Sequence, residues 1–222
     1  MLNEMEPDEH AHNRASLAGP SARSRNNHLK HQHILAVARD LFFANGFSAT
    51  SMEAVAKEAA VGKATLYEMF PNKIELLRAI ITIELDKRAD RMVFDEISPG
   101  HLRAALARFA HALIDLLLSA QNVAIYRIVS SEAPRHPELG RFFYENGPAR
   151  AIGLLADYLT TVMEKGLLQH GNPRLVAAQF IGLIRADMQT RSLFGVDEDI
   201  LRTERVLIVE SGVDVFLRAY AR

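Results

Sequence analysis

Hydrophobic residues recur at helical spacing through most of this 222-residue chain. Over residues 28–45, apolar positions three and four apart predict an amphipathic helix, and Gly46 follows as its C-cap. Asn72 can cap another helix, whose apolar stripe includes Leu76 and Leu77. Glycine and proline are sparse and β-branched runs are short, so the pattern favours an all-helical protein.

Residues 50–70, TSMEAVAKEAAVGKATLYEMF, predict two short helices joined by a tight turn. Thr50 can cap the first helix, and Glu53 stands three residues later, where a capping box needs an acid. The turn falls at residues 60–62, and the second helix begins at Lys63. This is the arrangement of a DNA-binding helix-turn-helix, whose second helix enters the major groove.

The second short helix leaves polar side chains on the face turned away from its core. A cation, a hydroxyl, a phenol and a carboxylate on one short helix suit contacts with phosphates and base edges. Lys63, Ala64, Tyr67 and Glu68 are expected to face the groove, while Thr50, Ser51, Thr65, Tyr67 and Lys73 are expected to hold the DNA backbone. Gly62 has no capping side chain and is expected to offer its free backbone end to a phosphate.

Beyond the helix that begins at Asn72, the pattern predicts further helices and no strand. Proline and glycine separate them, and the expected helices cover about 99–117, 122–132, 137–145, 148–166, 173–193 and 200–219. The expected fold class is therefore all-α, with an N-terminal three-helix helix-turn-helix domain and a C-terminal helical bundle. The expected domains are a disordered arm (1–24), the helix-turn-helix domain (25–75) and a regulatory and dimerisation domain (76–222).

The net charge of −1 hides an uneven distribution. Residues 1–22 hold one Arg against four acidic residues, whereas residues 23–91 hold eleven Lys or Arg against eight acidic residues. The basic excess therefore coincides with the helix-turn-helix, where phosphate attraction is needed. Because the excess is modest, geometry and duplicated half-sites must supply much of the affinity.

Composition excludes several classes of protein. The chain has no cysteine, which rules out disulfides and thiolate metal sites, and no apolar run long enough to span a membrane. We expect a cytoplasmic protein without a cofactor. His28, His31 and His33 lack an acidic partner, so no metal site is expected there.

An enzyme is not expected either. His111 and Asp115 share a helical face, but no nucleophile or phosphate loop accompanies them. The pair is interpreted as a polar pair in the core or as an anchor in a ligand pocket.

The last two long helices are apolar on most sides and need partners on most sides. Ala178 and Gly182 lie four residues apart, which permits another helix to approach closely. The expected homodimer interface contains Ala178, Gly182, Val209, Val213 and Phe216. The alternative is that these residues form a wholly internal core.

Residues 38–76 resemble the DNA-binding domain of TetR/AcrR-family transcriptional repressors. Two departures from the family pattern are Ala60, where a turn glycine is usual, and Gly62, where a capping serine is usual. The segment RIVSSEAPRHPELGRFFYENGP also resembles the regulatory domain of the AefR-like branch. The matching residues are Ala38, Leu41, Phe42, Gly46, Phe47, Thr50, Ser51, Met52, Val55, Ala56, Ala59, Val61, Thr65, Leu66, Tyr67, Phe70, Lys73 and Leu76.

This resemblance implies a homodimeric repressor that binds a pseudo-palindromic double-stranded DNA operator. It also implies a small-molecule effector in the C-terminal domain. Candidate residues for the effector pocket are Phe109, Leu113, Tyr126, Tyr158, Gln179 and Phe180, with ordinary core as the alternative for each. The alternative function is a helical interaction module that has lost DNA binding.

Overall fold

The computed structural model of the chain describes residues 22–89, 94, 100–196 and 198–222, and the regular structure within these ranges is helical. An isolated antiparallel bridge joins Leu168 to Ala221. The all-α expectation is therefore confirmed. Residues 1–21, most of the expected disordered arm, lie outside the described residues, and the first helix begins inside that arm. The helices are α1 (Ala22–Asn45), α2 (Met52–Glu58), α3 (Lys63–Met69), α4 (Lys73–Ala89), α5 (Leu102–Leu117), α6 (Ala120–Glu132), α7 (Pro137–Asn146), α8 (Pro148–Glu164), α9 (Pro173–Arg185), α10 (Met188–Phe194) and α11 (Glu198–Tyr220).

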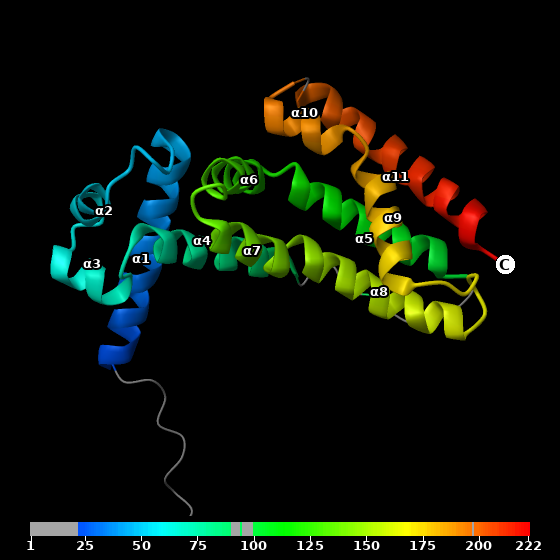
Figure 1. Ribbon diagram of the computed structural model, residues 1–222, viewed down its shortest axis with the longest axis horizontal. Helices are drawn as coiled ribbons and strands as arrows, with labels where there is room; N and C mark the ends of the chain where they lie inside the picture. The colour runs from blue at the N-terminus through cyan, green and yellow to red at the C-terminus, as the bar shows by residue number, and fades with distance from the viewer. Residues whose placement is uncertain (1–21, 90–93, 95–99, 197) are drawn as a thin grey trace, which may run out of the picture.

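The first three helices and the start of α4 form an N-terminal unit, seen at the left of Figure 1. Phe42 of α1, Val55 of α2, Leu66 of α3 and Leu77 of α4 meet in its core and are at most 1% exposed. Phe47, in the loop after α1, packs edge-on against Phe42 with ring centroids 5.2 Å apart. Helices as short as α2 and α3 are not stable alone, so this burial holds them in place.

The C-terminal domain, at the right of Figure 1, has a second core formed by α5, α8, α9 and α11. α8 packs against α9, and α11 packs against both α5 and α9. Aromatic rings run through this core, with Phe180 at 6.4 Å from Phe109 and at 4.9 Å from Phe216. Burial of one such ring contributes roughly 1.5–3 kcal/mol, so the domain can support itself.

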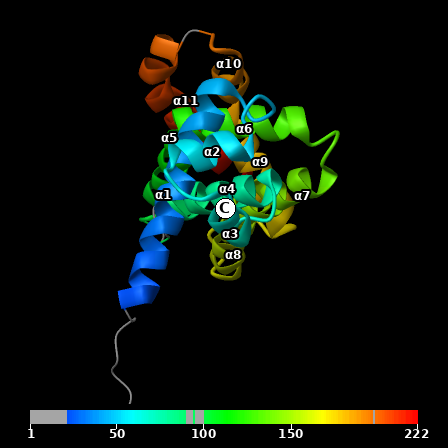
Figure 2. The same cartoon turned by 90° about the vertical axis from the view of Figure 1, so that its left-hand side faces the viewer.

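α4, α6 and α7 join the two parts of the molecule. α4 leaves the N-terminal unit and packs against α7, and Figure 2 looks onto the N-terminal unit from that end of the molecule. Ile125, Ile128 and Val129 of α6 are buried in the same cluster as Leu76 and Leu77 of α4. The core of the N-terminal unit is therefore continuous with α6 and α7.

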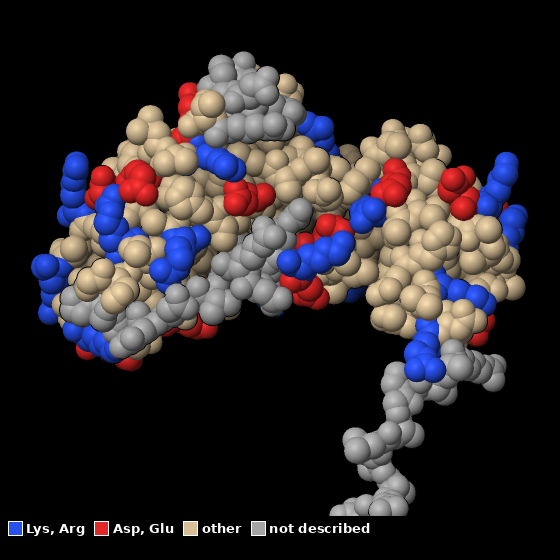
Figure 3. Space-filling view, turned by 180° about the vertical axis from the view of Figure 1, so that it is seen from behind, with Lys and Arg blue, Asp and Glu red and all other residues tan. Residues whose placement is uncertain are grey.

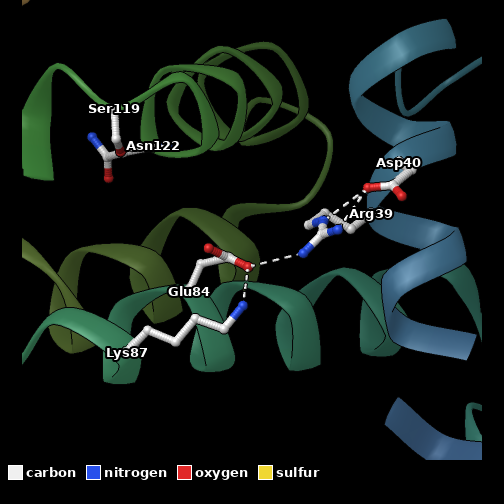
Figure 4. Close-up of polar contacts among 6 residues, drawn as sticks. All are labelled: Arg39, Asp40, Glu84, Lys87, Ser119 and Asn122. Carbon is white, nitrogen blue, oxygen red and sulfur yellow. Dashed lines mark hydrogen bonds and ion pairs between the residues drawn. The ribbon is translucent and has the colours of Figure 1, made fainter. Parts of the chain in front are cut away.

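A buried carboxylate braces α1 against α4. Glu84 of α4 is 5% exposed, receives the ammonium of Lys87 at 2.8 Å and lies 3.6 Å from Arg39 of α1 (Figure 4). Hydrogen bonding to Asp40 is the main cause that raises the pKa of Arg39, and the charge of Glu84 adds to it. The guanidinium therefore stays charged and fixes the angle between the two helices.

A second polar contact joins the N-terminal unit to α6. Ser48, in the loop between α1 and α2, donates a hydrogen bond of 2.6 Å to Glu132 at the end of α6. Glu132 is 5% exposed, and a buried carboxylate requires such a donor. This contact ties the helix-turn-helix directly to a helix of the C-terminal domain.

The helix expected at 173–193 is broken at Ala186 into α9 and α10, which corrects the sequence prediction. Ala186 has φ 39° and ψ −129°, a conformation that an L-residue other than glycine rarely adopts. Its N–H still donates to the carbonyl of Gly182, so α9 ends with its hydrogen bonds made. Hydrophobic periodicity alone does not reveal this break, because Met188 continues the buried face.

Among the described residues, no single helix is long and apolar enough to cross a membrane, although the bent pair α5 and α6 together passes by length and composition. The surface charge is mixed. Figure 3 shows basic and acidic side chains interspersed over the face seen from behind. On this face, charge of one sign does not gather into a large patch.

Candidate nucleic-acid interface and ligand cavity

α2 is capped one residue later than the sequence predicts. The hydroxyl of Ser51 accepts a hydrogen bond from the N–H of Ala54 at 3.1 Å, so Ser51 is the N-cap. Thr50 is 3% exposed, and its hydroxyl donates to the carbonyl of Gly46 at 2.9 Å. The capping role expected for Thr50 is therefore wrong, and its hydroxyl is held inside the protein rather than presented to DNA.

The turn between α2 and α3 contains a strained alanine. Ala60 has φ 53°, in the left-handed region where the family pattern has glycine. Gly62 caps α3 with extended backbone and no side-chain hydrogen bond, as the missing serine implies. Val61 packs between the helices as a partly buried plug. The turn keeps the helix-turn-helix shape at a cost in stability.

α3 is held by the fully buried Leu66 and the partly buried Met69, and one of its faces is turned outward. Leu66 is 0% exposed and Thr65 is half-buried. Lys63, Ala64 and Glu68 are exposed, and Tyr67 is 42% exposed. The expected outward face of the second short helix is therefore present on the surface.

The cation of Lys63 lies close to a carboxylate of α2. Its ammonium is 3.7 Å from Glu53, and both side chains are at least half exposed. The pKa of Glu53 is lowered, first by a hydrogen bond with its own backbone and then by the charge of Lys63. An exposed pair of this kind adds little stability, so the ammonium can exchange its partner for a phosphate.

Lys73 stabilises the N-terminal unit through contacts with the backbone of the unit and with an aromatic ring. Its ammonium donates to the carbonyls of Phe47 at 2.7 Å and of Thr50 at 2.9 Å, and lies 4.4 Å from the centre of the Phe47 ring. Partial burial lowers the pKa of Lys73, and the charge of Glu132 opposes that shift. The role expected for Lys73, holding the DNA backbone, conflicts with these internal contacts.

The C-terminal domain contains a small cavity of about 70 Å³ between α4 and the helices α5 to α10. Of the six residues expected to line an effector pocket, Leu113 and Tyr126 do so. Two buried polar side chains, Asn122 and Gln189, also line the cavity. The remaining lining residues are Leu85, Leu116, Leu117, Phe143, Gly147, Pro148, Ala151, Ile152, Ile181 and Arg185.

The other four expected pocket residues lie elsewhere. Phe109, Tyr158 and Phe180 are at most 5% exposed and belong to the core between α5, α8 and α9, so the alternative of ordinary core applies to them. Gln179 is exposed and accepts a hydrogen bond from the hydroxyl of Tyr220. The sequence therefore predicted which domain contains the cavity, but not most of the residues that line it.

The expected dimer residues divide into two groups. Val209, Val213 and Phe216 are 0% exposed and lie in the core of the protomer, so a partner chain cannot contact them. This corrects the expected interface. Ala178 and Gly182 lie on α9, and both are exposed on the side of α9 that faces away from its own buried residues.

His31, considered as a metal ligand, and Asp115, considered as part of an acid/base pair, make other contacts. Among the described residues, no group of three His, Asp or Glu is arranged to hold a metal ion. His31 stacks against Phe70 with ring centroids 4.8 Å apart. Asp115 forms an ion pair of 3.1 Å with Arg205 at the surface, so the expected pairing with His111 is replaced.

Sequence reasoning missed Gln189, Asn122 and the contact between Ser48 and Glu132. Asn122 carries a usable signal, because it is a polar residue close to the apolar run of α5. Ser48 and Glu132 are 84 residues apart, and nothing in a single sequence pairs them.

Two family profiles cover most of the chain. The profile for bacterial regulatory proteins of the tetR family matches residues 34–80, and the profile for the C-terminal domain of AefR-like transcriptional repressors matches residues 104–222. Among curated proteins, the HTH-type transcriptional regulator YvkB of Bacillus subtilis (strain 168) is 27% identical over 161 residues, which is 69% of this chain and 78% of YvkB.

Solved structures agree with the profiles. The flavonoid-responsive regulator FrrA is 33% identical with a TM-score of 0.75, and the match covers 87% of this chain and 98% of FrrA. A TetR-family regulator from Mesorhizobium loti MAFF303099 has a TM-score of 0.77 at 24% identity, over 88% of this chain and 98% of that chain. The second likeness supports the fold alone.

A helix-turn-helix unit joined to a helical C-terminal domain is the architecture of a DNA-binding transcriptional regulator. The family profiles and the similarity to FrrA identify the family. The chain belongs to the TetR family of bacterial transcriptional regulators, with an AefR-like C-terminal domain. Regulators of this family are not enzymes, which confirms the expectation from the sequence.

Proposed function

We propose that the chain is a ligand-responsive repressor that binds a pseudo-palindromic operator as a homodimer in the cytoplasm. The observation that carries this proposal is α3, a helix anchored by the fully buried Leu66 that exposes Lys63, Ala64, Tyr67 and Glu68. A short rigid helix with an exposed mixed polar face is the form that major-groove readers take.

The contacts with DNA are assigned by exposure. Lys63, Ala64, Tyr67 and Glu68 face the major groove, while Ser51, Gly62 and Thr65 approach the phosphates on either side. Thr50 and Lys73 hold the loop before α2 in place from inside and shape the interface without touching DNA.

The DNA assignment is tested by gel shift with the DNA that flanks the gene for this chain. Lys63→Ala is expected to weaken binding and to reduce the salt slope by about one, because one phosphate contact is lost. Tyr67→Phe removes only the hydroxyl and is expected to weaken binding by about threefold to tenfold.

Lys165→Ala is the matched control, because it removes a lysine at the end of α8, in the other domain. Unchanged binding by both Lys63→Ala and Tyr67→Phe would refute the interface. Loss of binding in the control variant would show that net charge, not α3, determines affinity. No binding by the wild-type chain at low salt would favour the interaction module that has lost DNA binding.

The homodimer is proposed to form through the outer faces of α9 and α11. Large apolar side chains are exposed there, and Phe194 of α10 beside them is 77% exposed. A contiguous exposed apolar surface marks an interaction site, and the family supplies the expectation of a second copy. The exposed apolar residues of α9 and α11 are Leu175, Leu183, Val206, Leu207 and Val215.

Gly182→Arg tests this face without disturbing the protomer. A Cβ atom placed at Gly182 meets nothing within 4 Å and the residue is exposed, so the variant is expected to fold and to sediment as a monomer at micromolar concentration. Gly100→Arg is the control, because a Cβ atom at Gly100 also meets nothing within 4 Å and Gly100 lies just before α5. A dimeric Gly182→Arg protein would place the interface elsewhere.

The effector is proposed to bind in the cavity lined by Leu113 and Tyr126. A cavity of about 70 Å³ is smaller than the roughly 300–1,000 Å³ that encloses a drug-sized ligand, so binding must part the surrounding helices. Leu85 of α4 and Phe143 of α7 belong both to the cavity wall and to the core cluster of the N-terminal unit. Expansion of the cavity therefore displaces α4 and the core of the N-terminal unit, which contains Leu77 of α4 and Leu66 of α3.

A flavonoid is the first effector to test, because FrrA is flavonoid-responsive and is similar over nearly its whole length. Leu113→Trp is expected to fill the cavity and abolish release by the effector while ligand-free operator binding remains. A coupling of about 1–3 kcal/mol would weaken operator binding roughly 5- to 150-fold, and the operator must weaken effector binding equally. Equal effector affinities with and without operator would rule out induction.

A further inference from the structure

One polar atom in the cavity wall has no partner. Gln189 of α10 is 5% exposed, and its Oε1 accepts no hydrogen bond within the described part of the chain. A buried acceptor without a donor is costly, so such atoms are rare unless a ligand or water supplies the donor. Gln189 lines the cavity, so a molecule in the cavity can reach its side chain.

The rest of the wall is mostly apolar. Tyr126 and Phe143 contribute aromatic rings 5.3 Å apart at right angles, and leucine and isoleucine side chains cover much of the remainder. Asn122, the other buried polar residue of the wall, already donates to the carbonyl of Leu117 at 3.4 Å. Among the fully buried polar atoms of the wall, the carbonyl oxygen of Gln189 is therefore the one that lacks a partner within the described residues, whereas Arg185 lines the cavity from an exposed position.

The backbone just before Gln189 is strained. Ala186 adopts φ 39° and ψ −129° at the break between α9 and α10. An unbroken helix would continue from Ile181 and Arg185 without this break, so the strained residue sets where α10 places Gln189. Strained backbone that persists in a folded protein occurs preferentially at ligand sites. Ala186 does not itself line the cavity, but the strain at this residue lies three positions before Gln189 and helps to set where its unpaired oxygen stands.

We propose that Gln189 is the specificity-determining residue of the effector cavity and that the effector carries a hydroxyl on an apolar, ring-bearing body. The hydroxyl donates its hydrogen bond to Oε1 of Gln189, and the ring packs against the edge-to-face pair of Tyr126 and Phe143. This deepens the effector part of the proposed function and rests on it. It goes further by naming the group that the cavity selects.

Small ring compounds test the selection directly, because the ligand-free cavity is too small for a larger probe. Phenol, anisole and toluene are titrated into the full-length chain and followed by amide chemical shifts. A purely apolar cavity favours toluene, because phenol must give up its hydrogen bonds to water. Anisole has the oxygen but no hydrogen to donate. The expected order is phenol about tenfold tighter than both toluene and anisole.

Gln189→Met keeps the volume of the side chain and removes the acceptor. The variant is expected to lose the preference for phenol while still binding toluene. Its ligand-free melting temperature is expected to be equal to or higher than that of the wild type, because an unsatisfied atom is removed. A structural glutamine would instead lower it. Thr190→Val, on the exposed side of the same helix, is the matched control and is expected to keep both the preference and the stability.

Equal affinities for phenol and toluene in the wild type would overturn the proposal, as would a preference that persists in Gln189→Met. Absence of binding by all three compounds would also overturn it. Operator binding by the same wild-type sample separates this failure from failure of the proposed function, because α3 and Gln189 lie in different domains. A chain that binds operator but shows no phenol preference keeps its function and loses only this assignment.

Discussion

The core around Leu66 and the proposed effector cavity differ in how completely they are filled, although an open groove of about 210 Å³ also lies between α1 and α4 at the edge of the N-terminal unit. In the first, Leu66 is fully buried, and the hydroxyl of Thr50 and the ammonium of Lys73 are bonded to backbone carbonyls. In the second, about 70 Å³ is empty and Oε1 of Gln189 is unpaired. A reader of DNA needs one fixed shape, whereas a sensor needs spare volume and spare hydrogen-bonding capacity that a ligand can use.

α6 joins these two regions. Its first half supplies Asn122 and Tyr126 to the cavity wall, and its second half buries Ile128 and Val129 in the core of the N-terminal unit. Glu132 then closes the connection through Ser48. If the proposed effector binds in the cavity, displacement of the first half of α6 would move its second half, so we propose α6 as a second route beside α4.

The largest effect is expected when the same substitution is made in both regions. Ala56→Leu adds volume to a filled core, where Ala56 is 3% exposed, and is expected to lower the free energy of unfolding by about 1–3 kcal/mol. Ala151→Leu adds the same volume at the cavity wall and is expected to cost little, because space is present. Urea unfolding of both variants measures the difference.

Ala151→Leu has a second expected consequence. It reduces the space for a ligand, so effector affinity should fall while ligand-free operator binding is retained. If both alanine variants lose similar stability, the cavity is not a reserve of free volume and the contrast between the two regions fails.

The next effect concerns the link between the regions. Ser48→Ala leaves the buried carboxylate of Glu132 without its donor and is expected to cost about 1–3 kcal/mol. The double variant Ser48→Ala/Glu132→Leu removes the stranded charge as well and is expected to be more stable than the single variant. Both are expected to weaken the effect of the inducer on operator affinity, measured by calorimetry. Full coupling in the double variant would leave α4 as the only route.

Replacing the two strained alanines is expected to change stability less than the substitutions above, and to increase it rather than lower it. Ala60→Gly and Ala186→Gly each relieve a backbone conformation that costs about 1–2 kcal/mol, less the roughly 0.5–1 kcal/mol by which glycine favours the unfolded chain. Both variants are therefore expected to melt at a higher temperature. Ala186→Gly should gain more, because its φ and ψ are further from any region open to alanine. A loss of stability in either variant would mean that the backbone at that alanine is not strained.

The sequence predicted the helix-turn-helix nearly completely because its signals are local. Apolar spacing, the turn and the outward residues of α3 lie within about twenty residues. The misplaced features were the cap, Ser51 rather than Thr50, and the contacts with the DNA backbone expected of Thr50 and Lys73, which bond inside the protein instead. Neighbouring hydroxyl residues are equivalent in pattern, and only the backbone angles decide which one caps.

The C-terminal domain was predicted less well because its features depend on distant partners. A helix that is apolar on most sides does not reveal which side faces its own core, so Val209, Val213 and Phe216 were assigned to an interface although the protomer buries them. The break at Ala186 has no glycine or proline to mark it. Because the break was not predicted from the sequence, Gln189 could not be predicted to line the cavity.

The smallest expected effect is a pH response confined to the N-terminal unit. His31 packs on the ring of Phe70, and its pKa is lowered, first by burial and then by the charge of His28. The unfolded chain therefore takes up a proton at this site more readily than the folded chain. The neutral side chain favours folding above the ordinary histidine pKa of about 6.5, and this contribution is lost as the pH falls through the lower folded pKa.

Acidification from about pH 7 to about pH 5 is accordingly expected to destabilise the N-terminal unit slightly, whereas the cavity, which no histidine lines, should not respond. Amide chemical shifts in α1 and α3, compared with those in α8 and α9, measure this contrast. His31→Gln should abolish the response in the N-terminal unit, and the exposed His33→Gln should preserve it. An equal response in both domains would show that acid acts on the whole molecule, so that the N-terminal unit would not be the more pH-sensitive of the two.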